Sequence, residues 1–265
     1  MLFYKSYMDD KIIGAMRIIF IAPEGGDCME VVNDRYHGCV IITHTKEDVT
    51  GSLPTKVKIQ RRFSQMLRYN TIGEKNITDA TDLNFTALDY YVKPNKSYDY
   101  MFVYEFSTGE ELSSKITIST PFVGILLRDS RGEYISGLNA KCSYKRNRAV
   151  KYVQSFYGRT PHAIINGNAN YDTGNCSGLF LPLDDKGKPI ICNPGQWNAE
   201  WNKAFLDFLT NGEVKLLKIY SGEMWMVQID DTPYEELASV GSISDFRFSW
   251  TEITDVPETE LVVFT

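Results

Sequence analysis

Two cysteines and two histidines lie close together near the beginning of the chain: Cys28, His37, Cys39 and His44. Thiolates and imidazoles are the ligands that zinc prefers in proteins, so this group could form a zinc site. The two cysteines are too far apart for the close cysteine pair of a zinc knuckle, and Cys39 stands in a β-branched stretch that predicts a strand. We therefore interpret the cysteines as buried side chains and the histidines as surface side chains, and we predict no metal.

A second polar stretch places four side-chain oxygen donors beside two glycines: Asn168, Asn170, Asp172 and Asn175 with Gly167 and Gly174. Its N-x-N-x-D spacing resembles the beginning of a calcium-binding loop. The bidentate glutamate expected at the twelfth position is missing, because Leu179 stands there. Side chains that cap their own backbone turns explain the composition more simply. We predict that residues 166–175 form a loop, and we expect no cofactor.

Residues suited to hydrolytic catalysis are few. The chain has three histidines and no G-x-S-x-G motif, so a nucleophile with an adjacent base is not indicated. Carboxylates could still converge in space as the acid pair of a glycoside hydrolase. The candidates, whose surroundings are typical of solvated helix and turn positions, are Asp207, Glu223, Glu235 and Glu236. We predict that the protein is not an enzyme.

The charge of the chain argues against a nucleic-acid partner. Its formal net charge is −6, with 28 basic and 34 acidic residues. The basic residues form only short clusters, such as those at 56–62 and 141–148. Nucleic-acid binding usually requires a broad positive surface, which this distribution does not predict.

The cysteines and the N-terminal residues indicate where the protein is made. The five cysteines are odd in number and irregular in spacing, which argues against a disulfide framework: Cys28, Cys39, Cys142, Cys176 and Cys192. Charged side chains interrupt the apolar runs of residues 1–26, so this stretch predicts neither a signal peptide nor a membrane span. We expect reduced thiols, assembly in a cytoplasm and no membrane insertion.

The elements that would position these residues are clearest near the C-terminus. Aromatic and apolar residues recur there at spacings of three and four, which predicts one amphipathic helix over about 194–210. Asn193 can cap this helix, Pro194 suits its first position, and Asn211-Gly212 supplies a left-handed stop. Strands of alternating pattern follow at 214–220, 224–229 and 246–250. The predicted core where the helix covers this sheet comprises Trp197, Trp201, Phe205, Phe208, Trp225, Phe246, Phe248 and Trp250.

The first half of the chain predicts strands only. With 265 residues, of which 43% are hydrophobic and 13% aromatic, the chain is long enough for two folded domains. Residues 97–106 alternate between aromatic and other side chains, and turn signals separate the earlier strands. The segment YVKPNKSYDYMFV resembles the late strands of a fibronectin type III domain, although the early-strand tryptophan of that family is absent. We predict a β-sandwich over 1–119 and a boundary in the small polar segment at 119–121.

The C-terminal elements carry a family pattern. An aromatic helix that ends in FLTNG is followed by EVKLLK, a short turn, a strand that ends in I-D, and F-x-F-x-W-x-E-I. An N-Y-x-x-G segment precedes the helix. Together these features, over about 121–253, resemble the distal-tail and baseplate structural proteins of bacteriophages that infect Gram-positive bacteria. The resemblance implies a mainly β chain, in which an antiparallel β-barrel or sandwich domain with one helix (120–265) follows the fibronectin-like domain.

The same resemblance implies a function and partners. The second domain would assemble into a closed ring, with six subunits, between the tail tube and the neighbouring baseplate proteins. The protein would be a structural part of the virion, assembled in the host cytoplasm. Closed rings require head-to-tail interfaces, and loops or sheet edges are suited to form them. The interface residues predicted in the 166–175 loop are Asn166, Asn168, Asn170, Tyr171, Asp172 and Asn175.

A carbohydrate-binding module that contacts the host surface is the alternative. Aromatic side chains can stack on sugars, and the chain offers Trp197, Trp201, Trp225 and Trp250. Each tryptophan stands on the apolar phase of its predicted element, which favours packing in the core. Tyr90 and Tyr91 are better candidates for exposure, because adjacent residues of a strand face opposite sides.

Overall fold

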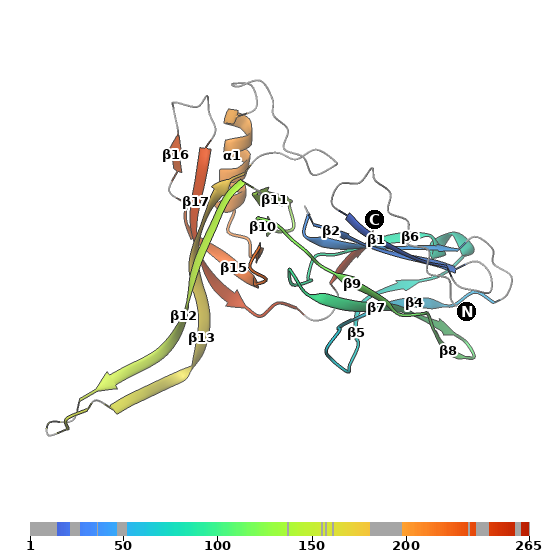
Figure 1. Cartoon of the computed structure of the whole chain (residues 1–265), viewed down its shortest axis with the longest axis horizontal. Coiled ribbons are helices and arrows are strands. Elements are labelled where there is room, and N and C mark those ends of the chain that lie inside the picture. Colours follow the sequence, from blue (N-terminus) through green and yellow to red (C-terminus); the bar gives the residue numbers. More distant parts are fainter. Residues whose placement is uncertain are drawn as a thin grey trace.

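The computed structural model describes residues 15–21, 27–35, 37–46, 52–136, 138–154, 156, 158–160, 162–180, 198–232, 234–236, 244–257 and 261–264. Within these residues the protein is mainly β, with antiparallel sheets and one α-helix. Figure 1 shows two units beside each other, each built on its own sheets. The mainly β fold class predicted from the sequence is therefore confirmed.

The first unit is a sandwich of two antiparallel sheets. One sheet has the order β1 (Ala15–Ile21), β2 (Asp27–Asp34), β3 (Cys39–Lys46), β6 (Phe85–Asp89) and β18 (Val262–Phe264). The other has the order β5 (Asn70–Asn76), β4 (Lys56–Phe63), β7 (Ser97–Phe106) and β8 (Gly109–Leu112), with β9 (Ile116–Ser119) also paired to β7. Alternate apolar side chains point inward because successive strand residues face opposite sides. The buried core includes Val31, Ile42, Ile59, Leu83, Phe85 and Phe102.

Several polar groups are buried in this sandwich, and Asp89 and His44 are two of them. The Asp89 carboxylate at the end of β6 accepts two hydrogen bonds from Arg61 of β4, at 2.7 and 2.9 Å, and one from the Tyr100 hydroxyl at 2.8 Å. His44 of β3 contacts the Leu83 carbonyl oxygen and the Tyr104 hydroxyl. These pairings satisfy groups that would otherwise be costly to bury, and they join the two sheets.

The second unit is an open sheet with a helix on one face. Its strand order is β11 (Glu133–Ser136), β10 (Ile125–Arg128), β14 (Lys215–Ile219), β15 (Met224–Asp231), β17 (Ser244–Thr254), β13 (His162–Leu179) and β12 (Leu138–Val153), and β16 (Tyr234–Glu236) also pairs with β17. The edge strands β11 and β12 do not pair with each other, so the sheet is not a closed barrel. Of the two forms anticipated for this unit, barrel or sandwich, the barrel is wrong.

Helix α1 (Asn198–Leu209) covers this sheet through aromatic contacts. The Phe205 ring stacks on Phe180 with centroids 4.4 Å apart and meets Phe246 edge-on at 4.7 Å. Gly212 follows the helix with φ of +77°, the left-handed conformation that glycine adopts most easily. Asn193, Pro194 and Trp197, placed at the start of the predicted helix, lie outside the described residues. No helix in the described part of the chain is long and apolar enough to cross a membrane.

The two units meet at an apolar junction. Its buried side chains come from both units: Cys39, Tyr90, Phe122, Leu126, Ile135, Leu216 and Met224. The ammonium group of Lys218 is buried there and donates a hydrogen bond to the Gly38 carbonyl oxygen at 2.6 Å. His37 pairs with Glu133 across the junction, and hydrogen bonding to that carboxylate raises the pKa of His37.

The chain crosses this junction twice. The expected boundary at 119–121 lies between β9 and β10, which belong to different units. Strand β18 then returns to the first sandwich and pairs with β6, for example Val263 with Leu88. Assigning all of residues 120–265 to the second unit is therefore wrong for the last strand. The strand is only three residues long and is held by pairing with a partner distant in sequence, a relation that its local pattern does not contain.

Candidate functional site

The most distinctive surface of the molecule is a hairpin that extends beyond the sheet. Strands β12 and β13 pair as far as Val153 and His162, whereas β17 pairs with β13 only from Thr173 to Leu179. Residues 144–171, which we call the arm, therefore form mostly a two-stranded ribbon. Figure 1 shows the arm projecting from the second unit, away from the first. The seven steps from residue 146 to residue 153 alone cover about 23 Å at strand spacing.

A buried carboxylate holds the base of the arm. Asp172 of β13 accepts two hydrogen bonds from Arg146 of β12, at 2.9 and 3.0 Å, and one from the Trp225 indole at 3.0 Å. The bonds from Arg146 are the main cause of the lowered pKa of Asp172. The Asp172 amide donates to the Glu252 carboxylate at 2.8 Å. The point where the hairpin leaves the sheet is therefore tied to β15 and β17.

Aromatic rings pack against the same base. The Tyr144 ring meets Trp225 edge-on at 4.9 Å, and Trp225 lies 4.8 Å from Trp250. Gly174 leaves room for this packing, because a Cβ atom there would lie 2.7 Å from the Trp250 ring and 2.4 Å from the Ser143 carbonyl oxygen. The direction of the arm is thus set by a close-packed base.

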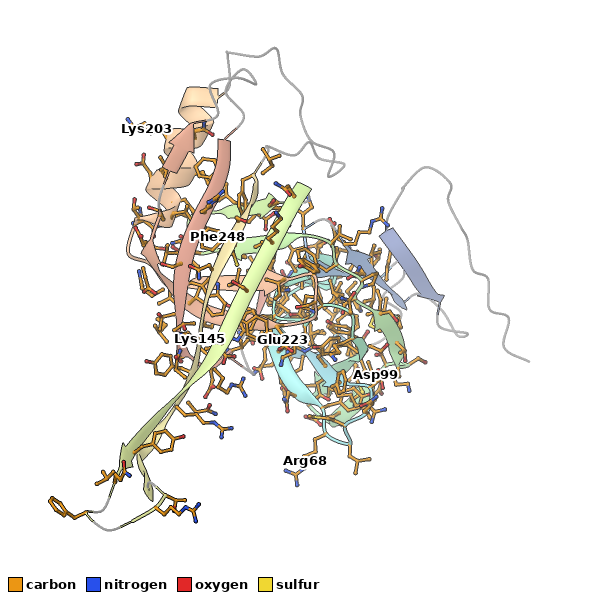
Figure 2. All side chains as sticks on the ribbon, turned by 60° about the vertical axis from the view of Figure 1, so that its left-hand side comes forward. Arg68, Asp99, Lys145, Lys203, Glu223 and Phe248 are labelled. Atoms are coloured by element: carbon orange, nitrogen blue, oxygen red, sulfur yellow. The ribbon has the colours of Figure 1, made fainter. Side chains whose placement is uncertain are left out.

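The outer part of the arm exposes apolar side chains. Phe156 is 98% exposed, Tyr152 is 70% exposed and Val153 is 42% exposed. Figure 2 shows side chains spread along the ribbon to its end. A two-stranded ribbon is only marginally stable in water by itself, and clustered exposed aromatics are typical of surfaces that bind a partner. The arm therefore has the chemistry of an interaction surface.

Charge is also distributed unevenly between the arm and the rest of the chain. The arm contains no acidic residue and has five basic ones: Lys145, Arg146, Arg148, Lys151 and Arg159. Since the whole chain carries −6, the remainder carries −6 − 5 = −11. Residues 222–265 contain ten acidic residues and one basic residue, Arg247. The arm is thus a cationic element on an anionic body.

The structure corrects the loop predicted at 166–175. All six predicted interface residues lie on strand β13, paired with β12 over most of its length. Of their described side chains, Asn170, Tyr171 and Asn175 are exposed, whereas Asp172 is buried. Asparagine and glycine favour turns locally, but pairing with β12 outweighs that preference. Asn170 and Asn175 instead stand at exposed positions of a strand.

The same strand geometry argues against a calcium-binding loop at these residues. Asn170 and Asp172 stand two residues apart on a part of β13 that pairs regularly with β12, so their backbone positions are separated by about 6–7 Å. A calcium loop instead folds such residues around one ion. The Asp172 carboxylate is already bonded to Arg146 and Trp225.

The four residues considered for zinc are distributed over two regions. Cys39 lies in the junction cluster, and His37 faces Glu133 of the second unit. His44 is buried inside the first sandwich, contrary to its prediction as a surface residue. The side chain of Cys28 lies outside the described ones. Within the described residues, the structure brings together no group of three potential metal ligands.

The carboxylates considered for catalysis stand on separate elements. Asp207 is exposed on α1, and Glu223 is exposed in the turn between β14 and β15. Glu235 and Glu236 lie on β16, which pairs with β17. Asp207 and Glu223 thus lie at the exposed helix and turn positions that their sequence surroundings predicted, whereas Glu235 and Glu236 lie on a strand.

The aromatic residues considered for sugar stacking lie mostly in cores. Trp225 and Trp250 are buried in the second unit, together with the four phenylalanines predicted there: Phe205, Phe208, Phe246 and Phe248. Tyr90 is buried at the junction, contrary to the expectation of exposure. The side chains of Trp197 and Trp201 lie outside the described ones. The predicted interface residues did not include Tyr152 and Phe156. The long stretch without acidic residues around them could have indicated a distinct surface.

Comparison of the chain with protein-family models, with curated proteins and with solved structures finds no match.

Proposed function

We propose that the protein is a structural component of a phage tail or phage-like particle, in which copies of the chain form a ring near the distal tail. The observation that carries this proposal is the projecting arm with its exposed aromatic side chains. A monomer leaves Phe156 and Tyr152 in water, whereas an assembly can bury them. The ring would join the tail tube to neighbouring baseplate proteins.

The C-terminal sequence pattern supports the same proposal. FLTNG forms the end of α1 and the stop after it, EVKLLK leads into β14, and F-x-F-x-W-x-E-I lies on β17. The segments that carry the family resemblance are thus adjacent parts of one helix-covered sheet. A ring needs one surface that binds a different surface of the next copy, and an arm on one side of the body suits that geometry.

Light scattering and electron microscopy of the purified chain test this proposal. We expect a concentration-dependent oligomer, with closed rings in the images. The double variant Tyr152→Ser/Phe156→Ser should shift the equilibrium toward monomer, because it removes apolar area that the assembly buries. Leu67→Ser is the matched control, since Leu67 is 93% exposed in the first unit, away from the arm.

Two results would contradict the proposal. One is a monomer at every concentration, with no rings in the images. The other is an equal effect of the arm variant and the Leu67→Ser control on assembly. Thermal unfolding of each variant shows whether the fold itself has been lost.

The carbohydrate-binding alternative is favoured by one observation, the exposure of tyrosines on the arm. Tyr144, Tyr152 and Tyr171 are 48%, 70% and 40% exposed. Sugars could stack on them, although Trp225 and Trp250, two of the tryptophans first considered for this role, are buried. A glycan screen with the natural chain, at a concentration where it is monomeric, distinguishes the two functions, because a glycan module binds without self-association.

A further inference from the structure

We infer that the arm of one subunit binds an acidic surface of β15 and β17 of the next copy. This inference rests on the proposed ring and names the surfaces that form it. The acidic surface comprises exposed and half-exposed residues on the two strands and directly after β17: Asp230, Asp231, Glu252, Ile253 and Asp255.

The arm and the C-terminal part of the chain carry opposite charges, which is the first reason to expect a second copy as the partner. The arm has five basic residues and no acidic ones, whereas the 222–265 segment carries a net charge of 1 − 10 = −9. Complementary surfaces attract each other during encounter and fix the register of binding. The chain therefore carries both members of a complementary pair on separate surfaces.

The direction of the arm is the second reason. Asp172 and Gly174 fix its base, so the ribbon runs away from the body of its own chain. The outer arm is therefore directed away from β15 and β17 of the same molecule, as both figures show. A neighbouring copy can meet the outer arm without bending of the base.

Exposed apolar side chains on both surfaces are the third reason. Ile253 is 48% exposed on β17 between Glu252 and Thr254, close in sequence to Asp255. It offers an apolar contact for the aromatic residues of the arm, such as Tyr152. Interfaces commonly place apolar contacts at the centre and charged groups at the rim.

Charge reversal tests the inference. The arm variant Lys145→Glu/Arg148→Glu and the acidic-surface variant Asp230→Lys/Asp231→Lys should each weaken self-association at least about tenfold. An equimolar mixture of the two variants should associate more strongly than either variant alone, because in alternating copies the introduced glutamates of one arm face the introduced lysines of the next copy. The control Arg68→Glu/Lys203→Glu makes the same charge change at two exposed sites outside the arm (Figure 2) and should associate like the natural chain.

The readouts are sedimentation velocity from low to high salt and thermal unfolding of every variant. Association of the natural chain should weaken as salt rises, since the screening length falls from about 10 Å at 0.1 M to about 3 Å at 1 M. Unfolding temperatures near that of the natural chain show that the variants fold.

The outcomes separate this inference from the proposed ring. Rings that form equally well with the arm variant, or a mixture that stays monomeric, overturn the inference and leave the ring standing. A natural chain that never associates contradicts both.

Fluorescence anisotropy with a single-stranded oligonucleotide tests whether the arm binds nucleic acid. If the arm variant loses oligonucleotide binding while self-association is unchanged, the partner is a nucleic acid and the inference is wrong.

A different observation supports a second inference, which does not depend on assembly. We infer that Cys142 and Cys176 form a disulfide bond when the protein meets an oxidising medium. The two residues are direct partners on β12 and β13, and their sulfur atoms lie 2.8 Å apart. Direct antiparallel partners have Cα atoms about 4.5–5.5 Å apart, inside the range of about 4.4–6.8 Å that a disulfide spans. In the reduced protein both residues are free thiols.

The surroundings of the two thiols suggest the order of reaction with a disulfide oxidant such as oxidised glutathione. The contact with Cys176 lowers the pKa of Cys142, whereas burial raises the pKa of Cys176. The Cys142 thiolate attacks the oxidant and releases one glutathione thiolate. Cys176 then gives up its proton and attacks the Cys142 sulfur, which releases the second glutathione. The oxidant thus gains two electrons and two protons, and the hairpin base gains one S–S bond.

Mass spectrometry of the folded chain after treatment with oxidised glutathione tests this inference. We expect an intact mass lower by two hydrogen atoms and a crosslinked peptide pair that contains Cys142 and Cys176. Cys142→Ser should abolish the crosslink, and Cys39→Ser, at the buried junction cysteine, should leave it. A stable glutathione adduct on Cys142, or a crosslink between other cysteines, would refute the inference.

Discussion

The buried ammonium group of Lys218 makes the stability of the protein depend on pH in a predictable direction. Lys218 lies on β14 at the junction, is 0% exposed and donates a hydrogen bond to the Gly38 carbonyl oxygen. Burial lowers its pKa from 10.5 to about 7, and the nearby Asp89 carboxylate partly opposes that shift. The folded state therefore binds fewer protons than the unfolded state between these two pKa values.

The sign of the effect follows from this difference in bound protons. Below about pH 7 both states hold the proton, and the full cost of burying the charge lowers the free energy of unfolding. As pH rises from about 7 toward 10.5, the folded state has already lost the proton and the cost disappears. The complete shift corresponds to about 5 kcal/mol at 1.36 kcal/mol for each pKa unit. From pH 7 to 9 the change would be roughly 2–3 kcal/mol.

The contribution of Lys218 to the free energy of unfolding can be measured by denaturant unfolding. The natural chain and Lys218→Met are compared at several pH values from 6 to 9. Other groups also titrate in this range, so the informative quantity is the difference between the two proteins. Lys218→Met should gain stability relative to the natural chain at pH 6 and lose most of that advantage by pH 9. Lys203→Met, at an exposed position on α1, should show no such trend.

A difference that stays constant over this range would refute the reasoning. It would mean that Lys218 keeps the same protonation state in both folded and unfolded chains. Nearby carboxylates, Asp89 first among them, would then offset the cost of burying the charge.

Three further predictions concern packing and burial, and denaturant unfolding measures each. Phe205→Ala should cost about 3–5 kcal/mol, because it empties the contact between α1 and the sheet; a loss under about 1 kcal/mol would show that this face is not core. Gly174→Ala should cost roughly 1–3 kcal/mol through its clash with Ser143 and Trp250, whereas Gly132→Ala, which meets nothing within 4 Å, serves as the control. Asp89→Ala should cost about 3–5 kcal/mol by leaving Arg61 buried without its partner, and adding Arg61→Met should recover part of that loss if the pairing is the cause.

Local periodicity in the sequence was sufficient to predict several elements. The spacing of Phe205, Phe208 and Leu209 predicted the buried face of α1, since residues three and four apart lie on one side of a helix. Alternation at 97–106 predicted strand β7 in the same way. In each case the information lies within a few neighbouring residues, which is why a single sequence contains it.

Relations between distant residues could not be predicted in this way. The asparagines of 166–175 favour turns, yet all of them lie on the longest strand of the described chain, where Asn170 and Asn175 pair with β12. Lys218 carries a charge, and lysine is seldom fully buried, but the first unit covers it. The return of β18 to the first sandwich likewise depends on a partner, β6, that lies far earlier in the chain.

The arm shows most clearly which features follow from the sequence and which depend on the tertiary structure. The sequence by itself determined that residues 144–171 lack acidic side chains and that acidic residues crowd 222–265, because charge is a property of composition. Only the tertiary structure decided that the first stretch projects as a ribbon while β15 and β17 of the second remain with the body. Strand pairing, the Asp172 contacts and the space left by Gly174 set that arrangement, and each joins residues far apart in the chain.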